Sequence, residues 1–310
     1  MKPPQTTAFR LSSVKGLKPG IHRMRVNVEG LERRYVVHIP QSHDGRTPLP
    51  IVMIFHGGGG TAATMMRMTA WVDKSEQAGF LAAFLEGMSL DPTRPARFVD
   101  NPQFWNDGTG REHVGRRNID DVGFVEACLD DLVSRFPVDE GQLFATGFSN
   151  GAFMVSRLGL ELAHRFVAIA PVAGIYLTED ASPSPSVSVL CIVGTEDPLS
   201  PLHGGEVRWP WGGKESQPAV FDSIEKWAQM AGCDARPRIV VQGDGVRAVA
   251  YGPRTGQAEV VLYTVEGMGH TWPGARISLP ERVFGKSTDK IRACDVIWDF
   301  FQQHKRQTDR

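Results

Sequence analysis

The chain has 310 residues, of which 41% are hydrophobic and 22% charged, and its formal net charge is −1. This composition is ordinary for a soluble globular protein and excludes the disordered and membrane-spanning classes. The near-zero net charge provides no basic surface for nucleic acid or another polyanion. No break in composition suggests two domains, so we expect a leader segment over residues 1–15 and one catalytic domain over residues 16–310.

The N-terminal stretch MKPPQTTAFRLSSVKGLKPG contains no apolar segment as long as a signal peptide requires. No later segment is long enough to cross a membrane. We therefore expect a cytoplasmic protein if the chain is complete, and a secreted one if a leader has been removed.

The predicted elements begin with two strands, residues 21–28 and 33–40, whose linking Glu-Gly pair favours a β-hairpin. The apolar run LPIVMIF predicts a buried strand that enters the glycine loop HGGGG, and a helical pattern over residues 61–77 and the strand FLAAFLEG follow. Strands and helices then alternate. Helices are expected at 119–136, 150–163, 218–231 and 288–304, and strands at 142–148, 166–172, 187–194, near 238–250 and at 258–266.

This alternation predicts an α/β fold, with a mostly parallel central sheet covered by helices on both faces and an N-terminal β-hairpin. Two long segments, residues 87–118 and 198–216, interrupt the alternation and are rich in Gly, Pro, Trp and charged residues. Long loops in such domains frequently form a binding site, although surface loops without function are the alternative.

Ser149 lies in the stretch GFSNG, between an apolar strand pattern and a helical pattern. A strand, a tight turn and a helix in this order are typical of a nucleophile elbow, in which the turn exposes the serine hydroxyl. Gly147 and Gly151 leave room where side chains would collide with the neighbouring strand or helix. The helix N-terminus also favours the negative charge that develops during acyl transfer.

An elbow serine needs an acid and a histidine, which follow it in this chain order. Asp197 comes directly after the strand VSVLCIVG, and His270 lies in a glycine loop after the strand VVLYTV. Glu196 is the competing carboxylate, and Pro198 slightly favours Asp197 by fixing the turn. The histidines at other positions are expected to be structural or exposed: His22, His38, His43, His113, His164, His203 and His304. Neither a metal nor another cofactor is expected, because no clustered ligand motif such as HExxH is present.

The glycine loop HGGGG has two interpretations. Gly57, Gly59 and Ala62 match the dinucleotide-binding pattern GxGxxA, with Glu86 at the end of the next strand. A loop of the HGGG kind also supplies an oxyanion-hole amide in esterases. The second interpretation is favoured because it also accounts for Ser149, Asp197 and His270.

The motifs HGGGG, WNDG, DDVGFV, GFSNG, GTEDP and GHTWPG resemble the polyhydroxybutyrate depolymerase and feruloyl esterase group of carbohydrate esterase family 1. The resemblance covers nearly the whole chain from about Gly16. It implies an α/β-hydrolase fold and a carboxylic ester substrate. It also implies Ser149 as nucleophile, Asp197 rather than Glu196 as the acid, and His270 as the base.

For the oxyanion hole we expect the backbone amides of Gly58 and Asn150. Many relatives have a cysteine where this chain has Gly58, but a backbone donor does not depend on its side chain. Serine peptidase or acyltransferase chemistry on the same fold is also compatible with these residues, since the acyl-enzyme step is shared. The motifs leave open a catalytically silent binding protein and, through GxGxxA, a nicotinamide oxidoreductase.

Aromatic residues of the long loops, and one beside the base, are candidates for substrate contact: Trp105, Trp209, Trp211 and Trp272. Trp272 could equally hold the His270 loop in place. The cysteines lack CxxC spacing and are expected to be buried free thiols: Cys128, Cys191, Cys233 and Cys294. Secreted members of the resembling family often pair a cysteine at the position of Cys233 with another one before the strand of the final histidine. The segment YGPRTGQAEV has none.

Overall fold

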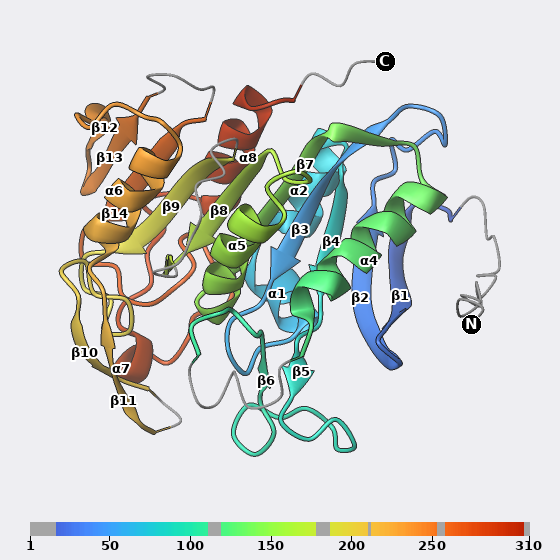
Figure 1. Ribbon diagram of the computed structural model, residues 1–310, viewed down its shortest axis with the longest axis horizontal. Coiled ribbons are helices and arrows are strands. Elements are labelled where there is room, and N and C mark those ends of the chain that lie inside the picture. The colour runs from blue at the N-terminus through green and yellow to red at the C-terminus, as the bar shows by residue number, and fades with distance from the viewer. Residues whose placement is uncertain (1–16, 111–118, 178–186, 210–211, 253–257, 307–310) are drawn as a thin grey trace, which may run out of the picture.

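One ten-stranded sheet forms the centre of the computed structural model, which describes residues 17–110, 119–177, 187–209, 212–252 and 258–306 (Figure 1). In spatial order the strands are β1 (Gly20–Val28), β2 (Leu31–Ile39), β4 (Leu81–Leu85), β3 (Leu49–Phe55), β7 (Val138–Phe148), β8 (Ala168–Val172), β9 (Ser188–Gly194), β14 (Val260–Val265), β13 (Val246–Tyr251) and β12 (Arg238–Gly243). The predicted α/β fold with a mostly parallel sheet is confirmed.

The six central strands, from β4 to β14 in this order, are parallel to one another. All residues of β4, β8 and β9 are buried, because helices cover both faces of the sheet. This burial explains why these strands are continuous apolar runs rather than alternating patterns. Antiparallel pairs flank the parallel centre, β1 with β2 on one side and β13 with β12 on the other. The first pair is the predicted N-terminal hairpin.

The helices form two layers, one on each face of the sheet (Figure 1). One layer contains α4 (Asp121–Arg135), α5 (Asn150–Glu161) and α6 (Val220–Met230), and the other contains α1 (Ala62–Met68), α2 (Trp71–Ala78) and α8 (Ala293–Gln303). Each layer has its own apolar cluster against the sheet. Phe124, Met154 and Ile224 belong to the first cluster, and Met65 and Ile297 to the second.

Two predicted helices differ from those observed. The helix expected over 61–77 is interrupted, since Thr69 adopts an extended conformation and its hydroxyl donates to Met65 O. The last helix begins at Ala293 rather than at residue 288. The backbone just before it bonds to the loop after β14 instead, with Gly274 N donating to Thr288 O. A local bond of the Thr69 hydroxyl therefore accompanies the first boundary, whereas a backbone bond to a distant loop accompanies the second.

The two long loop segments contain short paired strands, which are β5 (Met88–Ser89) with β6 (Gln103–Phe104) and β10 (Gly205–Arg208) with β11 (Lys214–Gln217). A short helix, α7 (Glu281–Phe284), follows the loop after β14. None of the helices in the described ranges combines the length and apolarity that a membrane crossing requires. The predicted leader over residues 1–15 lies outside the described residues, and the predicted domain limits remain a prediction.

Candidate active site

Ser149 occupies a sharp turn between β7 and α5. Its φ of 55° and ψ of −118° form a conformation that L-residues rarely adopt, and it costs on the order of 1–3 kcal/mol. The backbone packed around this turn leaves no room for a side chain at Gly147 or Gly151. A Cβ atom on Gly147 would lie 2.3 Å from Gly151 O, and one on Gly151 would lie 2.5 Å from His56 O. The predicted strand–turn–helix context of Ser149 is therefore present.

His270 lies between Ser149 and Asp197. Its Nε2 is 2.7 Å from Ser149 Oγ, and its Nδ1 is 2.9 Å and 3.0 Å from the two carboxylate oxygens of Asp197. The carboxylate can only accept from Nδ1–H, so Nε2 is left to accept the proton of the serine hydroxyl. The side chains of His270 and Asp197 are almost completely buried, which excludes water from their contact.

Asp197 is fixed by the turn that follows β9. Its Oδ1 accepts hydrogen bonds from the backbone N–H groups of Leu199 and Ser200, both at 2.8 Å. The competing carboxylate Glu196 is exposed. The residues alone favoured Asp197 over Glu196 only slightly. In the structure it is Asp197 that contacts His270.

The loop that carries His270 is held by close backbone packing. His270 N donates to Phe284 O at 2.5 Å, and Gly269 N donates to Lys286 O at 2.9 Å. A Cβ atom on Gly269 would lie 2.3 Å from Phe284 O, so this approach requires glycine. The rings of Phe148 and Phe284 pack near the imidazole, with centroids 5.2 Å and 6.2 Å from its centroid.

The glycine loop after β3 passes directly beside the serine. A Cβ atom on Gly57 would lie 3.3 Å from Ser149 Cβ. The loop is closed by hydrogen bonds from Gly60 N to Gly57 O and from Gly59 N to Gln103 O. Across the described part of the chain, the N–H groups of Gly58 and Asn150 donate to no protein acceptor. Both amides are therefore available to a ligand.

Comparison with known proteins identifies the family. The putative esterase NocK of Nocardia uniformis subsp. tsuyamanensis is 30% identical to this chain over 294 residues, which cover 89% of this chain and 80% of that protein. The chain belongs to this esterase family.

Feruloyl esterases are among the relatives, as the resemblance predicted. Feruloyl esterase B of Piromyces equi is 25% identical over 77% of this chain, which spans 42% of that protein. A probable feruloyl esterase C of Aspergillus niger is 25% identical over 63% of this chain and 68% of its own length. These relatives do not include a protein named polyhydroxybutyrate depolymerase. No family model matches the chain.

Solved structures agree with the fold. The acetyl xylan esterase from Aspergillus awamori superimposes with a TM-score of 0.54 at 14% identity, over 81% of this chain and 94% of that chain. A thermostable esterase gives a TM-score of 0.53 at 12% identity, over 92% of this chain and 63% of that chain. At these identities the likeness shows the α/β-hydrolase fold alone.

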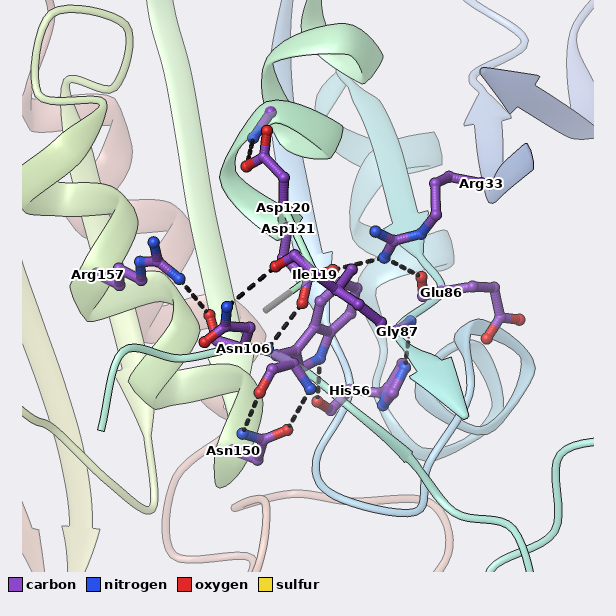
Figure 2. A network of polar contacts seen from close by, with 12 residues as sticks. Arg33, His56, Glu86, Gly87, Asn106, Ile119, Asp120, Asp121, Asn150 and Arg157 are labelled. Carbon is purple, nitrogen blue, oxygen red and sulfur yellow. Dashed lines mark hydrogen bonds and ion pairs between the residues drawn. The ribbon is translucent and has the colours of Figure 1, made fainter. Parts of the chain in front are cut away.

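The esterase contains a second buried histidine beside the site, which is not among the residues predicted from the sequence. His56 Nε2 accepts from Gly87 N at 2.9 Å (Figure 2). Nδ1 therefore carries the proton, and it donates to Gly57 O at 2.8 Å. Burial, with a smaller effect of the Arg33 charge, lowers the pKa of His56 to about 4. His56 is thus neutral at pH 7 and joins the glycine loop to the segment after β4. The position of His56 as the first residue of HGGGG is the feature of the sequence that could have indicated this role.

The predicted substrate-contact tryptophans of the esterase are mostly interior. Trp105 and Trp272 are 0% and 1% exposed, and Trp209 is 7% exposed with its indole N–H donating to Glu215 at 2.9 Å. Trp211 lies outside the described residues. The burial of Trp272 beside His270 fits the interpretation in which it holds the loop. Direct substrate contact by these tryptophans remains a prediction.

The four cysteines of the esterase are buried and free, as their sequence context predicted. The Cys233 thiol donates a hydrogen bond to Ala258 O at 3.5 Å. Burial raises the pKa of the Cys191 and Cys294 thiols, the latter to about 12, so these thiols stay protonated at neutral pH.

Proposed function

We propose that the protein is a serine carboxylester hydrolase that works through an acyl-enzyme on Ser149. The observation that carries the proposal is the position of His270 Nε2, 2.7 Å from the serine hydroxyl, while Nδ1 faces Asp197. Membership of the esterase family supports an ester substrate.

In the first half-reaction, Ser149 Oγ attacks the ester carbonyl carbon while His270 Nε2 takes the hydroxyl proton. Asp197 keeps the proton on Nδ1 and stabilises the imidazolium that forms. The carbonyl π electrons become the oxyanion, which the N–H groups of Gly58 and Asn150 bind, each contributing roughly 3 kcal/mol to transition-state stabilisation. When the tetrahedral intermediate collapses, His270 passes its proton to the departing alcohol and the acyl group stays on Ser149.

In the second half-reaction, water replaces the alcohol and gives a proton to His270 Nε2 as its oxygen attacks the acyl carbon. The second tetrahedral intermediate breaks the bond to Ser149 Oγ, which recovers the proton from His270. The products are a carboxylic acid and the free enzyme. Feruloyl and acetylxylan esters are the first substrates to examine, because relatives and solved structures of this fold bear these names.

The test is the initial rate of hydrolysis of p-nitrophenyl acetate, methyl ferulate, acetylated xylan and 3-hydroxybutyrate oligomers. Ser149→Ala should lower kcat by about 10⁴-fold or more on any ester that the parent hydrolyses. Ser156→Ala is the matched control, since Ser156 is a buried serine of the following helix whose hydroxyl bonds to Ala152 O. Intact-protein mass spectra taken during turnover should reveal one acyl group on the parent and none on Ser149→Ala. A parent that is inert on every ester would overturn the proposal.

A further inference from the structure

One short segment connects the two loops that carry the proposed oxyanion donors. Residues 105–107, here called the WND segment, directly follow β6 and bond both to the start of the glycine loop and to the start of α5. The segment is buried at Trp105 and Asp107, which are 0% and 1% exposed. None of the three residues takes part in a chemical step of the proposed reaction.

The WND segment forms hydrogen bonds with both polar groups of the Asn150 side chain. Asn150 Oδ1 accepts from Trp105 N at 2.8 Å, and Nδ2 donates to Asp107 Oδ2 at 2.7 Å and to Trp105 O at 3.3 Å. Asn150 itself is only 5% exposed. The residue that directly follows the nucleophile is therefore held through its side chain while its backbone N–H stays free.

The same segment also binds the glycine loop. The indole N–H of Trp105 donates to His56 O at 2.9 Å, at the point where β3 ends and the glycine loop begins. The indole ring also packs on the imidazole of His56, with centroids 4.9 Å apart. Trp105 thus contacts Asn150 through its backbone and the glycine loop through its side chain.

The WND segment is itself anchored to the fold at Asn106. Asn106 N donates to Asp121 Oδ2 at 2.7 Å, Asn106 Nδ2 donates to Ile119 O, and Arg157 donates to Asn106 O at 2.7 Å. Asp121 forms a buried ion pair with Arg33 at 2.6 Å, and both side chains are 1% exposed. These contacts connect the segment to α4, α5 and β2 (Figure 2).

We propose that the WND segment sets the separation of the two oxyanion donors, with Trp105 and the Asn150 side chain as positioning residues. The inference rests on the proposed function and deepens it. Donors on two separate loops stabilise an oxyanion only when their relative position is fixed to within about 0.5 Å. The glycine loop has no side chains at residues 57–60 to hold it, so its position depends on bonds such as that from the Trp105 indole.

Trp105→Phe tests this role because it removes the indole N–H but keeps an aromatic ring beside His56. Trp71→Phe is the matched control. Trp71 is also fully buried, and its indole nitrogen finds no hydrogen-bond partner among the described residues. The two variants lose the same atoms, and only the first loses a bond to the glycine loop.

Two measurements separate positioning from general damage. The first is kcat and KM on the ester that the parent hydrolyses best. The second is the affinity for an aryl trifluoromethyl ketone, whose carbonyl carbon bonds to Ser149 Oγ. In this adduct the carbonyl oxygen becomes an alkoxide in the proposed hole, and the serine proton moves to His270. Trp105→Phe should lower kcat by about 10-fold to 100-fold, and the inhibitor affinity by a similar factor, with KM nearly unchanged. Trp71→Phe should change each quantity less than about 3-fold.

The inference is overturned if Trp105→Phe behaves like Trp71→Phe, or if its kcat falls without a matching loss of inhibitor affinity. Should Trp105→Phe fail to fold in a thermal melt, the same measurements on Asn150→Ala decide the question. Ser149→Ala is assayed beside them. An active parent that depends on Ser149 but not on Trp105 refutes this inference alone, whereas an inert parent refutes the proposed function as well.

Discussion

His56 should make the esterase sensitive to acid, and His56→Gln should remove part of this sensitivity. A glutamine can keep the two contacts of the imidazole, since its amide nitrogen can donate to Gly57 O and its oxygen can accept from Gly87 N. Unlike histidine, it does not titrate. A proton added to His56 Nε2 would instead face the N–H of Gly87 and break the contact between the two loops.

The size of the effect follows from the pKa of His56, which is about 4 in the folded protein and about 6.5 in an unfolded chain. Because the folded-state pKa is the lower one, His56 contributes its full stability above about pH 6.5 and loses it as the pH falls towards 4. The linkage relation gives a loss of about 2 kcal/mol between pH 7 and pH 5, and of about 3 kcal/mol in total. The side chain is completely buried, so solvent screening does not reduce this figure.

The assay is urea unfolding at several pH values between 5 and 7.5. Carboxylates and exposed histidines change stability equally in parent and variant, so the difference between the two slopes isolates His56. Between pH 7 and pH 5, His56→Gln should lose about 2 kcal/mol less unfolding free energy than the parent. His164→Gln serves as the surface control, since that side chain is 63% exposed. Parallel pH profiles for parent and His56→Gln would refute the argument.

Two further substitutions test the packing around the site. Gly151→Ala should lower both the melting temperature and kcat, the latter about 10-fold or more, because the new Cβ would meet the carbonyl oxygens of Phe55 and His56 at 2.6 Å and 2.5 Å. Gly252→Ala, where a Cβ meets nothing within 4 Å, should change neither quantity. Asp121→Asn should cost about 3–5 kcal/mol in urea unfolding, because it leaves the buried Arg33 guanidinium without an opposite charge. Asp130→Asn, on the same helix, removes an exposed ion pair with Arg165 and should cost less than about 1 kcal/mol, so equal losses would contradict the anchoring role of Asp121.

The sequence could predict the sheet because its parallel strands are buried on both faces and therefore appear as uninterrupted apolar runs. It could also place the candidate triad, because the carboxyl ends of neighbouring parallel strands meet at one edge of a sheet. Ser149 follows β7, Asp197 follows β9 and His270 follows β14. Local patterns predicted these positions except for the choice between Asp197 and Glu196, which depended on the resemblance to the esterase family.

The two helix boundaries and the roles of Trp105 and His56 were not predictable from the sequence. The break at Thr69 has no glycine or proline to mark it, and the start of α8 depends on a backbone bond to a distant loop. Trp105 looked like a ligand contact because an aromatic residue in a polar loop fits either a substrate or an interior position. The role of His56 depends on Gly87, which is 31 residues away in the sequence.

The burial of all four native thiols makes the protein suitable for single-site labelling. Cys128, Cys191, Cys233 and Cys294 are the complete set of cysteines in the chain. A cysteine introduced at Ala96, an exposed position in the loop between β5 and β6, would be the one accessible thiol. A maleimide dye attached there would report the motion of this loop in the otherwise unmodified chain, without first replacing any native cysteine.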